Sequence, residues 1–210
     1  WNGQWFKWEN RNTNFLYGQP DGGPTHDAPQ NGYLNRSRVS LDYIPRDNNH
    51  PYRPAIIFRM AEAYLSYAEA LNESSERMSH KQEILDNLNK IRHRAGIAEY
   101  GTGTDENGFT RIKINFSDQK EVRRLIHKER RVEFVGEGVR YHDLRRWKTA
   151  HYGIGNLNEQ GENPDWGVNG PDYGMNYYGT EYTDQGDNAF FKRTKYMDRV
   201  YPRKFYWYPI

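Results

Sequence analysis

Cysteine is absent from all 210 residues of this chain. Its absence excludes a disulfide framework, a thiolate metal site and a cysteine nucleophile. No apolar run reaches the roughly 18–20 residues that a membrane-spanning helix needs, and no signal peptide is recognisable. The chain opens on Trp1 without an initiator Met, so we expect it to be a processed or truncated piece.

Neither positive nor negative charge is in excess. Thirty Lys and Arg residues are matched by 28 Asp and Glu residues, which gives a net charge of +2. Nothing therefore drives the chain as a whole toward nucleic acid or anionic lipid. Basic residues do run along 123–131, but Glu121, Glu129 and Glu133 interleave with them. We expect an ion-paired helix face there and no nucleic-acid partner.

Aliphatic residues are scarce, whereas aromatic residues are plentiful. Only 35% of the residues are hydrophobic, yet 15% are aromatic, with 17 Tyr and six Trp. Disordered chains are poor in aromatics, so this composition argues against disorder. Rings that carry a polar atom pack well at half-wet positions and also serve as platforms for ligands.

Three zones follow one another along the chain. Residues 1–50 are rich in Asn, Gly, Pro and aromatics, which predicts a variable loop segment with one short strand near 38–43. Residues 51–150 show helical periodicity, and residues 151–210 return to Gly, Asn, Tyr and Asp. We interpret 1–210 as one domain with a helical middle and a loop-rich C-terminal segment.

Hydrophobic periodicity predicts four helices in the middle zone, near 55–72, 80–95, 118–135 and 140–149. Pro54 would sit near the first turn of the first of these helices, where its missing N–H costs nothing. This helix is expected to bury an apolar face of Ile57, Met60, Ala61, Tyr64, Ala68 and Leu71. Its opposite stripe is Arg59, Glu62, Ser66, Glu69 and Glu73.

Capping signals and apolar stripes mark the other three helices. Ser79 and Gln82 have the spacing of a capping box for the second helix, and Gly96 can provide its left-handed stop. Asp118 precedes the third helix, which Gly136 follows. The expected buried positions are Ile84, Leu88, Ile91 and Ala95, then Val122, Leu125, Ile126 and Val132, and finally Tyr141, Leu144 and Trp147.

Four amphipathic helices joined by turns indicate a mainly α fold of two stacked helical hairpins, with long irregular loops and a few short strands. The second pair begins about sixty residues after the first, because residues 100–115 form an inserted loop. This spacing is too long for a regular tetratricopeptide array.

Four motifs occur in order along residues 59–210. They are Arg59–Ala70 (RMAEAYLSYAEA), Leu88–Gly96 (LNKIRHRAG), the Glu-Arg-Arg-x-Glu block with its continuation to Trp147, and the terminal Tyr208-Pro209-Ile210. Together they resemble the SusD/RagB family of nutrient-binding proteins. Pro209-Ile210 matches the start of the family's terminal Pro-Ile-Pro signature, and the chain stops one residue short of the last Pro.

The resemblance implies tetratricopeptide-like helices, no catalytic residues and no cofactor. It implies a lipoprotein at the extracellular face of the outer membrane in Bacteroidetes. The implied partners are a glycan or oligosaccharide ligand and a SusC-like TonB-dependent transporter. The family's lipid anchor lies in an N-terminal part that has no counterpart here, and the membrane is expected to be contacted only through it. Because the family binds ligands mostly through variable loops, the motifs indicate the scaffold and not the site.

The charged motif residues allow a catalytic and a structural interpretation. Glu129, Glu133 and Glu137 recur every four residues, and paired carboxylates can catalyse glycoside cleavage. However, Glu129 interrupts an apolar stripe, and a buried carboxylate needs a charged or donor partner. We therefore predict a structural role for the charged motif residues, namely Arg59, Glu62, Glu129, Glu133, Arg140 and Asp143.

Aromatic clusters in the loops are the candidate ligand contacts. Sugar rings pack their C–H faces on flat side chains while amides, carboxylates and guanidinium groups bind the hydroxyls. Two clusters have this mixture, although rings in loop-rich regions also serve as core. The candidate residues are Trp1, Trp5, Trp8 and Tyr17 in the first cluster, and Trp166, Tyr173 and Tyr177 in the second.

No metal site is expected. The seven His residues form no His-Glu-x-x-His pattern. Residues 105–108 resemble a fragment of a calcium loop, but its remaining ligand positions are missing, so a polar turn is expected there.

Three functions remain open from the sequence. The first is surface capture of a glycan or other nutrient for a transporter, and the second is a helical scaffold for protein docking without a small-ligand site. The third is a fragment of a glycoside hydrolase, which needs a carboxylate pair in a cleft. Polar, aromatic-rich loops favour the first, because a pure scaffold has no need of them. We expect no enzymatic activity.

Overall fold

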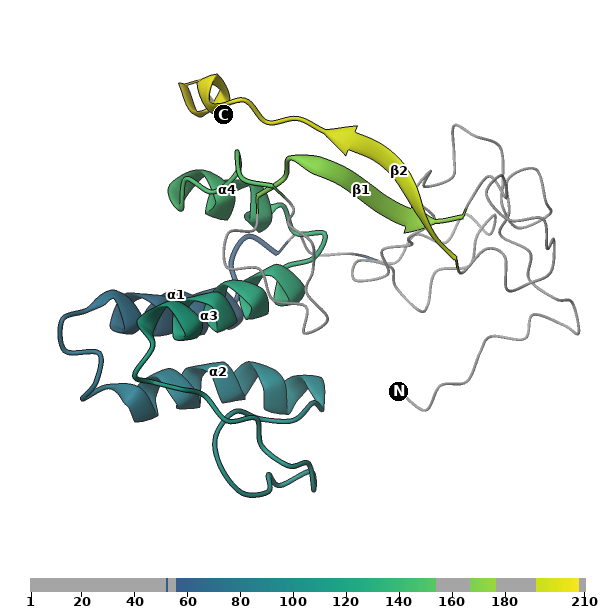
Figure 1. Ribbon diagram of the computed structural model, residues 1–210. Coiled ribbons are helices and arrows are strands. Elements are labelled where there is room, and N and C mark those ends of the chain that lie inside the picture. Colours follow the sequence, from purple (N-terminus) through teal and green to yellow (C-terminus); the bar gives the residue numbers. More distant parts are fainter. Residues whose placement is uncertain (1–51, 53–55, 154–166, 177–191, 208–210) are drawn as a thin grey trace, which may run out of the picture. The chain divides into compact units, whose positions relative to one another are not determined.

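The computed structural model describes Tyr52 and residues 56–153, 167–176 and 192–207 (Figure 1). These residues belong to two compact units. The helical unit comprises the described residues up to Ala150, and the C-terminal unit comprises the described residues from His151 onward. The strand expected near 38–43 lies outside the described residues.

Three helices of similar length form the body of the helical unit (Figure 1). They are α1 (Met60–Glu73), α2 (Lys81–Ala95) and α3 (Gln119–Glu133). α1 packs against both α2 and α3. The last turn of α1 bonds to the first turn of α3 through Asn72 and Gln119, so these two helices are antiparallel. The mainly α architecture expected from the sequence is confirmed.

The core of the helical unit lies between these three helices. Leu65 of α1, Ile84 and Leu88 of α2 and Val122 and Ile126 of α3 are each 0% exposed. Burying such aliphatic side chains stabilises a fold by about 1.5–3 kcal/mol apiece, which makes this cluster the main source of stability in the unit.

The start of α1 and the face that it buries differ from the prediction. The helix begins at Met60, because Arg59 is in an extended conformation with φ −141°. Ile57 is 96% exposed and Met60 is 58% exposed, so neither belongs to the core. Leu65 is buried instead. Glu69 is also buried, although it was predicted to lie on the stripe opposite the apolar face.

The ends of α2 and α3 follow two of the three expected capping signals. Asp118 caps α3 by accepting hydrogen bonds from the backbone N–H groups of Lys120 and Glu121 at 2.9 and 3.2 Å. Gly96 ends α2 in the left-handed region with φ 67°. The capping box is wrong, because the Ser79 hydroxyl donates back to the Glu76 carbonyl and leaves the start of α2 without a side-chain cap.

α3 and the short α4 (Val139–Arg146) are each shorter than the periodicity suggested. Val132 near the end of α3 is 63% exposed, so the predicted stripe stops one turn earlier. Tyr141 on α4 is 44% exposed, whereas Leu144 is buried as expected. Trp147 follows α4 directly and is half-buried.

The connection from α2 to α3 is a long irregular loop, as the sequence predicted. Asp105 organises its tip. The Asp105 carboxylate accepts hydrogen bonds from the backbone N–H groups of Glu99, Asn107 and Phe109 at 2.8–3.1 Å. These bonds lower the pKa of the Asp105 carboxyl against the opposing effect of desolvation. The calcium-like fragment is therefore a polar turn.

A two-stranded antiparallel ribbon forms the middle of the C-terminal unit (Figure 1). It pairs β1 (Gly170–Met175) with β2 (Arg193–Arg199), and the register is irregular between Asp172 and Tyr173. A 3₁₀ turn, η1 (Arg203–Trp207), follows β2. No strand is predicted in this region from the sequence pattern.

No helix in the described parts of the chain combines the length and the apolar character that crossing a bilayer requires.

Candidate functional site

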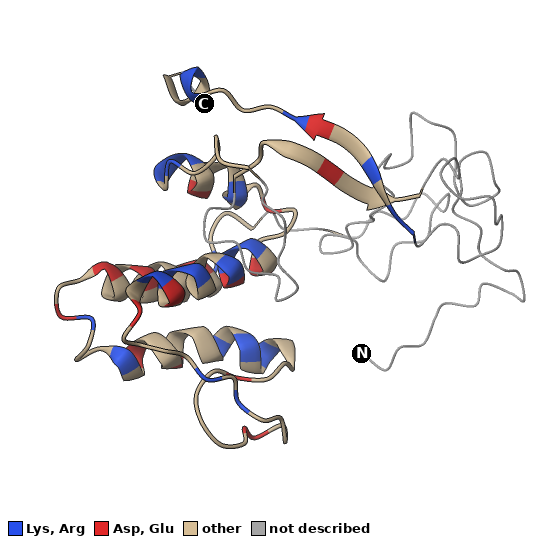
Figure 2. Ribbon diagram, viewed as in Figure 1, with Lys and Arg blue, Asp and Glu red and all other residues tan. Residues whose placement is uncertain are grey.

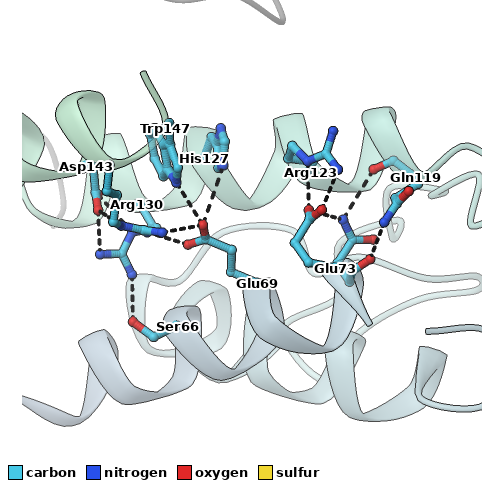
Figure 3. A network of polar contacts seen from close by, with 11 residues as sticks. Ser66, Glu69, Glu73, Gln119, Arg123, His127, Arg130, Asp143 and Trp147 are labelled. Carbon is cyan, nitrogen blue, oxygen red and sulfur yellow. Dashed lines mark hydrogen bonds and ion pairs between the residues drawn. The ribbon is translucent and has the colours of Figure 1, made fainter. Parts of the chain in front are cut away.

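Glu69 of α1 is the centre of a polar network that joins three helices (Figure 3). Its carboxylate accepts two hydrogen bonds from the Arg146 guanidinium, at 2.6 and 2.5 Å, and one from the Trp147 indole N–H at 2.7 Å. Desolvation raises the pKa of the Glu69 carboxyl, but these donors outweigh it and lower the pKa below its usual range. Glu69 is therefore ionised at neutral pH.

Arg130 of α3 and Asp143 of α4 form a second, parallel ion pair in the same network (Figure 3). The guanidinium donates to both carboxylate oxygens, at 2.8 and 3.0 Å, and each side chain is almost fully buried. Arg130 also donates to the Ser66 hydroxyl at 3.0 Å, which connects the pair to α1. Arg146 bonds both Asp143 and Glu69, so the two ion pairs are linked.

His127 of α3 stacks on the Trp147 ring, with 3.4 Å between the ring centroids and 15° between the planes. Its Nε2 lies 3.9 Å from the Glu69 carboxylate. Burial lowers the pKa of His127 to about 4, although the neighbouring Glu69 acts in the opposite direction. The imidazole is thus neutral at pH 7, and it stacks on Trp147 as an uncharged aromatic ring.

An open hollow of about 440 Å³ lies beside this network. Its polar lining residues come from α1, α3 and α4, and Val139 and Ala70 contribute apolar surface. Such a mixture is suited to binding hydroxyl groups by hydrogen bonds. The polar lining is Glu62, Ser66, Glu69, Glu73, Arg130, His142, Asp143 and Arg146.

Glu129 of α3 is 5% exposed, as its place inside the apolar stripe predicted. It accepts a hydrogen bond from Arg92 of α2 at 2.5 Å and one from the Tyr100 hydroxyl at 2.8 Å. Desolvation and the Glu129 charge raise the pKa of the Tyr100 hydroxyl, so that hydroxyl remains a donor at neutral pH. The pairing links the end of α2 to α3.

Arg59 attaches the extended segment before α1 to the end of α3. It forms ion pairs with Glu133 and with Glu137, the latter at 2.7 Å. Arg94 of α2 also pairs with Glu133, and the Arg59 guanidinium lies 4.7 Å from the Phe134 ring centroid. The hydrogen bonds that Arg59 donates to Glu137 and Glu133 raise the pKa of its guanidinium.

These contacts describe what the charged motif residues do. The side chains of Glu129, Glu133 and Asp143 each bind at least one arginine, which supports the structural interpretation of the motif charges. Burial lowers the pKa of Arg140 to about 10, and its guanidinium lies 5.9 Å from the Trp147 ring centroid. Glu62 lines the hollow.

Most of the aromatic residues proposed as ligand contacts lie outside the described residues. This holds for Trp1, Trp5, Trp8, Tyr17, Trp166 and Tyr177. Tyr173, in β1, is described and is 39% exposed. The Arg193 guanidinium of β2 lies 4.2 Å from the centroid of its ring.

The C-terminal unit also exposes aromatic side chains that were not predicted to contact ligand. Trp207 in η1 is 88% exposed and Tyr196 in β2 is 37% exposed. Thr194 and Tyr196, whose residue types favour strands, were the local signal for β2. The Gly-rich and Asn-rich surroundings indicated loop instead.

Comparison with known proteins places the chain in a family. The model of the SusD family matches residues 3–210. Three SusD-like proteins of Formosa agariphila are similar over about half of the chain. SusD-like protein P25 is 32% identical over 109 residues and P38 is 32% identical over 103 residues. SusD-like protein P2 is 33% identical over 109 residues.

The matched segments cover 52%, 49% and 50% of this chain but only 18–19% of each relative, so this chain corresponds to a small part of those longer proteins. No solved structure matches it. Since the family model spans almost every residue, from the Trp-rich start to the terminal Tyr-Pro-Ile, this chain belongs to the SusD family.

Proposed function

We propose that this chain is part of a cell-surface protein that captures glycans or other nutrients and delivers them to a SusC-like TonB-dependent transporter. The observation that carries the proposal is the family match over residues 3–210. The protein would act at the extracellular face of the outer membrane, held there by a lipid anchor in a part of the protein not included here.

The ion pairs of the helical unit support a binding role. A carboxylate that acts as acid, base or nucleophile must be able to reach its substrate. Glu129 is buried and bonded to Arg92. Glu69 and Asp143 line the hollow, but both oxygens of each carboxylate already accept hydrogen bonds from arginines. These side chains hold the helices together, so we propose that the helical unit is a scaffold and that the protein is not an enzyme.

Ligand contacts would then come from aromatic side chains outside the helices. Tyr173 and Trp207 show that the C-terminal unit exposes such rings. The loop clusters at 1–17 and 166–177 contain further candidates. Several rings acting together would give modest affinity, because each exposed stack contributes little by itself.

Protein docking is a second candidate function, and one observation favours it. Ile56, Ile57 and Phe58 precede α1 and are 62%, 96% and 61% exposed. Exposed apolar side chains in succession are typical of surfaces that another protein covers. A scaffold that works only in this way would bind no glycan.

A binding screen separates these functions. The purified chain is titrated against a panel of neutral and charged polysaccharides by affinity electrophoresis, and each mixture is analysed for released reducing sugar. We expect retardation by at least one polysaccharide and no product. Sustained release of reducing sugar after repurification would show an enzyme. Binding to no member of the panel would favour the docking scaffold.

A further inference from the structure

Although the net charge of the whole chain is near zero, the described ribbon of the C-terminal unit is basic. The described residues of this unit carry six basic residues and two acidic ones, Asp172 and Asp198, a local net charge of +4. In Figure 2, Lys and Arg mark several positions along β2, whereas Asp198 is its one acidic position. The basic residues are Lys192, Arg193, Lys195, Arg199, Arg203 and Lys204.

Both carboxylates of the described ribbon are already paired. Asp198 accepts from Lys195 at 2.7 Å, and Asp172 forms an ion pair with Arg199. The positive charge that remains is therefore not balanced by acidic side chains within the described part of this unit. Residues 177–191, which join the two strands, contain Glu181, Asp184 and Asp187 and no basic residue. Basic residues are thus concentrated on β2 and directly after it.

The helical unit provides the contrast. Between residues 56 and 150, 18 basic residues accompany 15 acidic ones, and Figure 2 shows both signs interleaved along α3. Its arginines are used in buried or half-buried pairs, such as Arg92 with Glu129 and Arg130 with Asp143. The charges of the helical unit hold helices together, whereas those of the ribbon are exposed.

Register places an aromatic ring among these cations. Tyr173 is the Cα partner of Lys195, and Met175 is the partner of Arg193. Because side chains alternate along a strand, Tyr173, Arg193 and Lys195 share one face of the ribbon. The contact of Arg193 with the Tyr173 ring, at 4.2 Å, supports this placement. Beyond β2, the exposed Arg203 and Lys204 stand beside the exposed Trp207 in η1.

We propose that this basic, aromatic ribbon binds anionic polysaccharide, a glycan that carries carboxylate or sulfate groups. The proposal rests on the proposed glycan-binding function and names its substrate class. The C–H face of a sugar can stack on an aromatic ring. Guanidinium groups form bidentate hydrogen bonds with carboxylate or sulfate oxygens. A ribbon that presents both kinds of group on one face is complementary to a chain of charged sugars.

The test compares dextran sulfate and polygalacturonate with neutral dextran, using the full 210-residue chain in affinity electrophoresis and calorimetric titration. We expect binding to the charged polysaccharides, weakening as salt is added because screening reduces interactions between exposed charges. Replacing three cations together, in R193Q/R203Q/K204Q, should weaken this binding about tenfold or more, since each exposed cation makes a modest contribution and three are lost. Y173A should weaken binding to the sugar chain as well.

A matched control removes the same charge elsewhere. Lys113, Lys120 and Lys148 are exposed in the helical unit, so K113Q/K120Q/K148Q lowers the net charge equally and should leave binding within about twofold of the wild type. The opposite change is made in residues 177–191, which join the two strands. Removing three negative charges there, in E181Q/D184N/D187N, should strengthen binding. Circular dichroism and thermal melts confirm that each variant is folded.

Several results would overturn the proposal. If both triple Lys/Arg variants weaken binding equally, the effect is bulk charge and the ribbon is not the site. If a single-stranded oligonucleotide binds as tightly as the sulfated glycan, the ribbon recognises polyanions rather than sugars. Binding to neutral glycans alone would refute the anionic preference and leave the proposed function standing. Binding to no glycan at all would refute both.

Discussion

The guanidinium of Arg130 and the carboxylate of Asp143 are joined by two hydrogen bonds, at 2.8 and 3.0 Å, while each residue is only 3% exposed. This geometry attaches the short α4 to α3 through charge rather than through apolar packing. Partly exposed Arg146 extends the connection to Glu69 of α1. α1, α3 and α4 are therefore joined by polar contacts in addition to the aliphatic core.

Removing Arg130 should be strongly destabilising. In R130A the Asp143 carboxylate stays buried but loses its principal partner, and breaking a buried pair costs about 3–5 kcal/mol. Replacing both residues by apolar ones, in R130M/D143L, should recover a large part of this loss. Denaturant titration measures the free energy of unfolding in each case.

A matched exposed pair serves as the control. Arg123 and Glu73 form an ion pair across α3 and α1 with side chains 37% and 40% exposed (Figure 3). Exposed pairs contribute about 0–1 kcal/mol, so R123A should unfold almost like the wild type. Equal losses in R130A and R123A would contradict the special role of the buried pair.

Replacing Glu129 by Ala should also lower the free energy of unfolding by about 3–5 kcal/mol, because Arg92 then remains buried without its carboxylate. The matched variant replaces Glu76, whose side chain is 77% exposed, and should cost less than about 0.5 kcal/mol. Urea titration compares the two. A loss below about 1 kcal/mol for E129A would mean that the pair contributes as little as a surface one.

Stability should fall as the pH is lowered from 6.5 toward 4. The pKa of His127 is about 4 in the folded chain and 6.5 by its ordinary value, so in this window the unfolded chain binds the extra proton and is favoured. The full difference corresponds to about 3 kcal/mol. H127Q should flatten this part of the profile of unfolding free energy against pH.

Glu69 titrates in a different window. Because the pKa of its carboxyl is lowered below 4.5, its contribution is present above that pH and is lost only at more acidic values. Urea titrations at pH 7, 5.5 and 4.5 therefore report mainly on His127. An unchanged slope in H127Q would show that another group is responsible.

Trp5→Ala and Trp8→Ala should each weaken glycan binding by about 1–3 kcal/mol if these rings are central contacts. Isothermal titration with a polysaccharide identified in the binding screen measures this, and thermal melts test folding. Normal binding by both variants would favour the second cluster, at 166–177, as the site. Unfolding of both would identify the rings as core.

Some features of the helical unit could be predicted from the sequence because they depend on local chemistry. Asp118 caps α3 through its own neighbours, and Gly96 ends α2 because it adopts a left-handed φ without a side-chain clash. The burial of Glu129 was also predictable, since a helix period of 3.6 residues places it among Val122, Leu125 and Ile126.

Tertiary structure decided where α1 begins and which residues it buries. Periodicity gave Ile57 and Met60 the same weight as Ala61, but Arg59 is attached to Glu133 and Glu137 and remains extended. The Arg146 guanidinium of α4 and the Trp147 indole N–H make it favourable to bury Glu69. No pattern within α1 predicts these partners. Likewise, Tyr173 meets Arg193 only through strand register, 20 positions apart in sequence. The sequence by itself thus determined the helices with their local caps, while long-range ion pairs and strand register decided which charges and rings are buried or exposed.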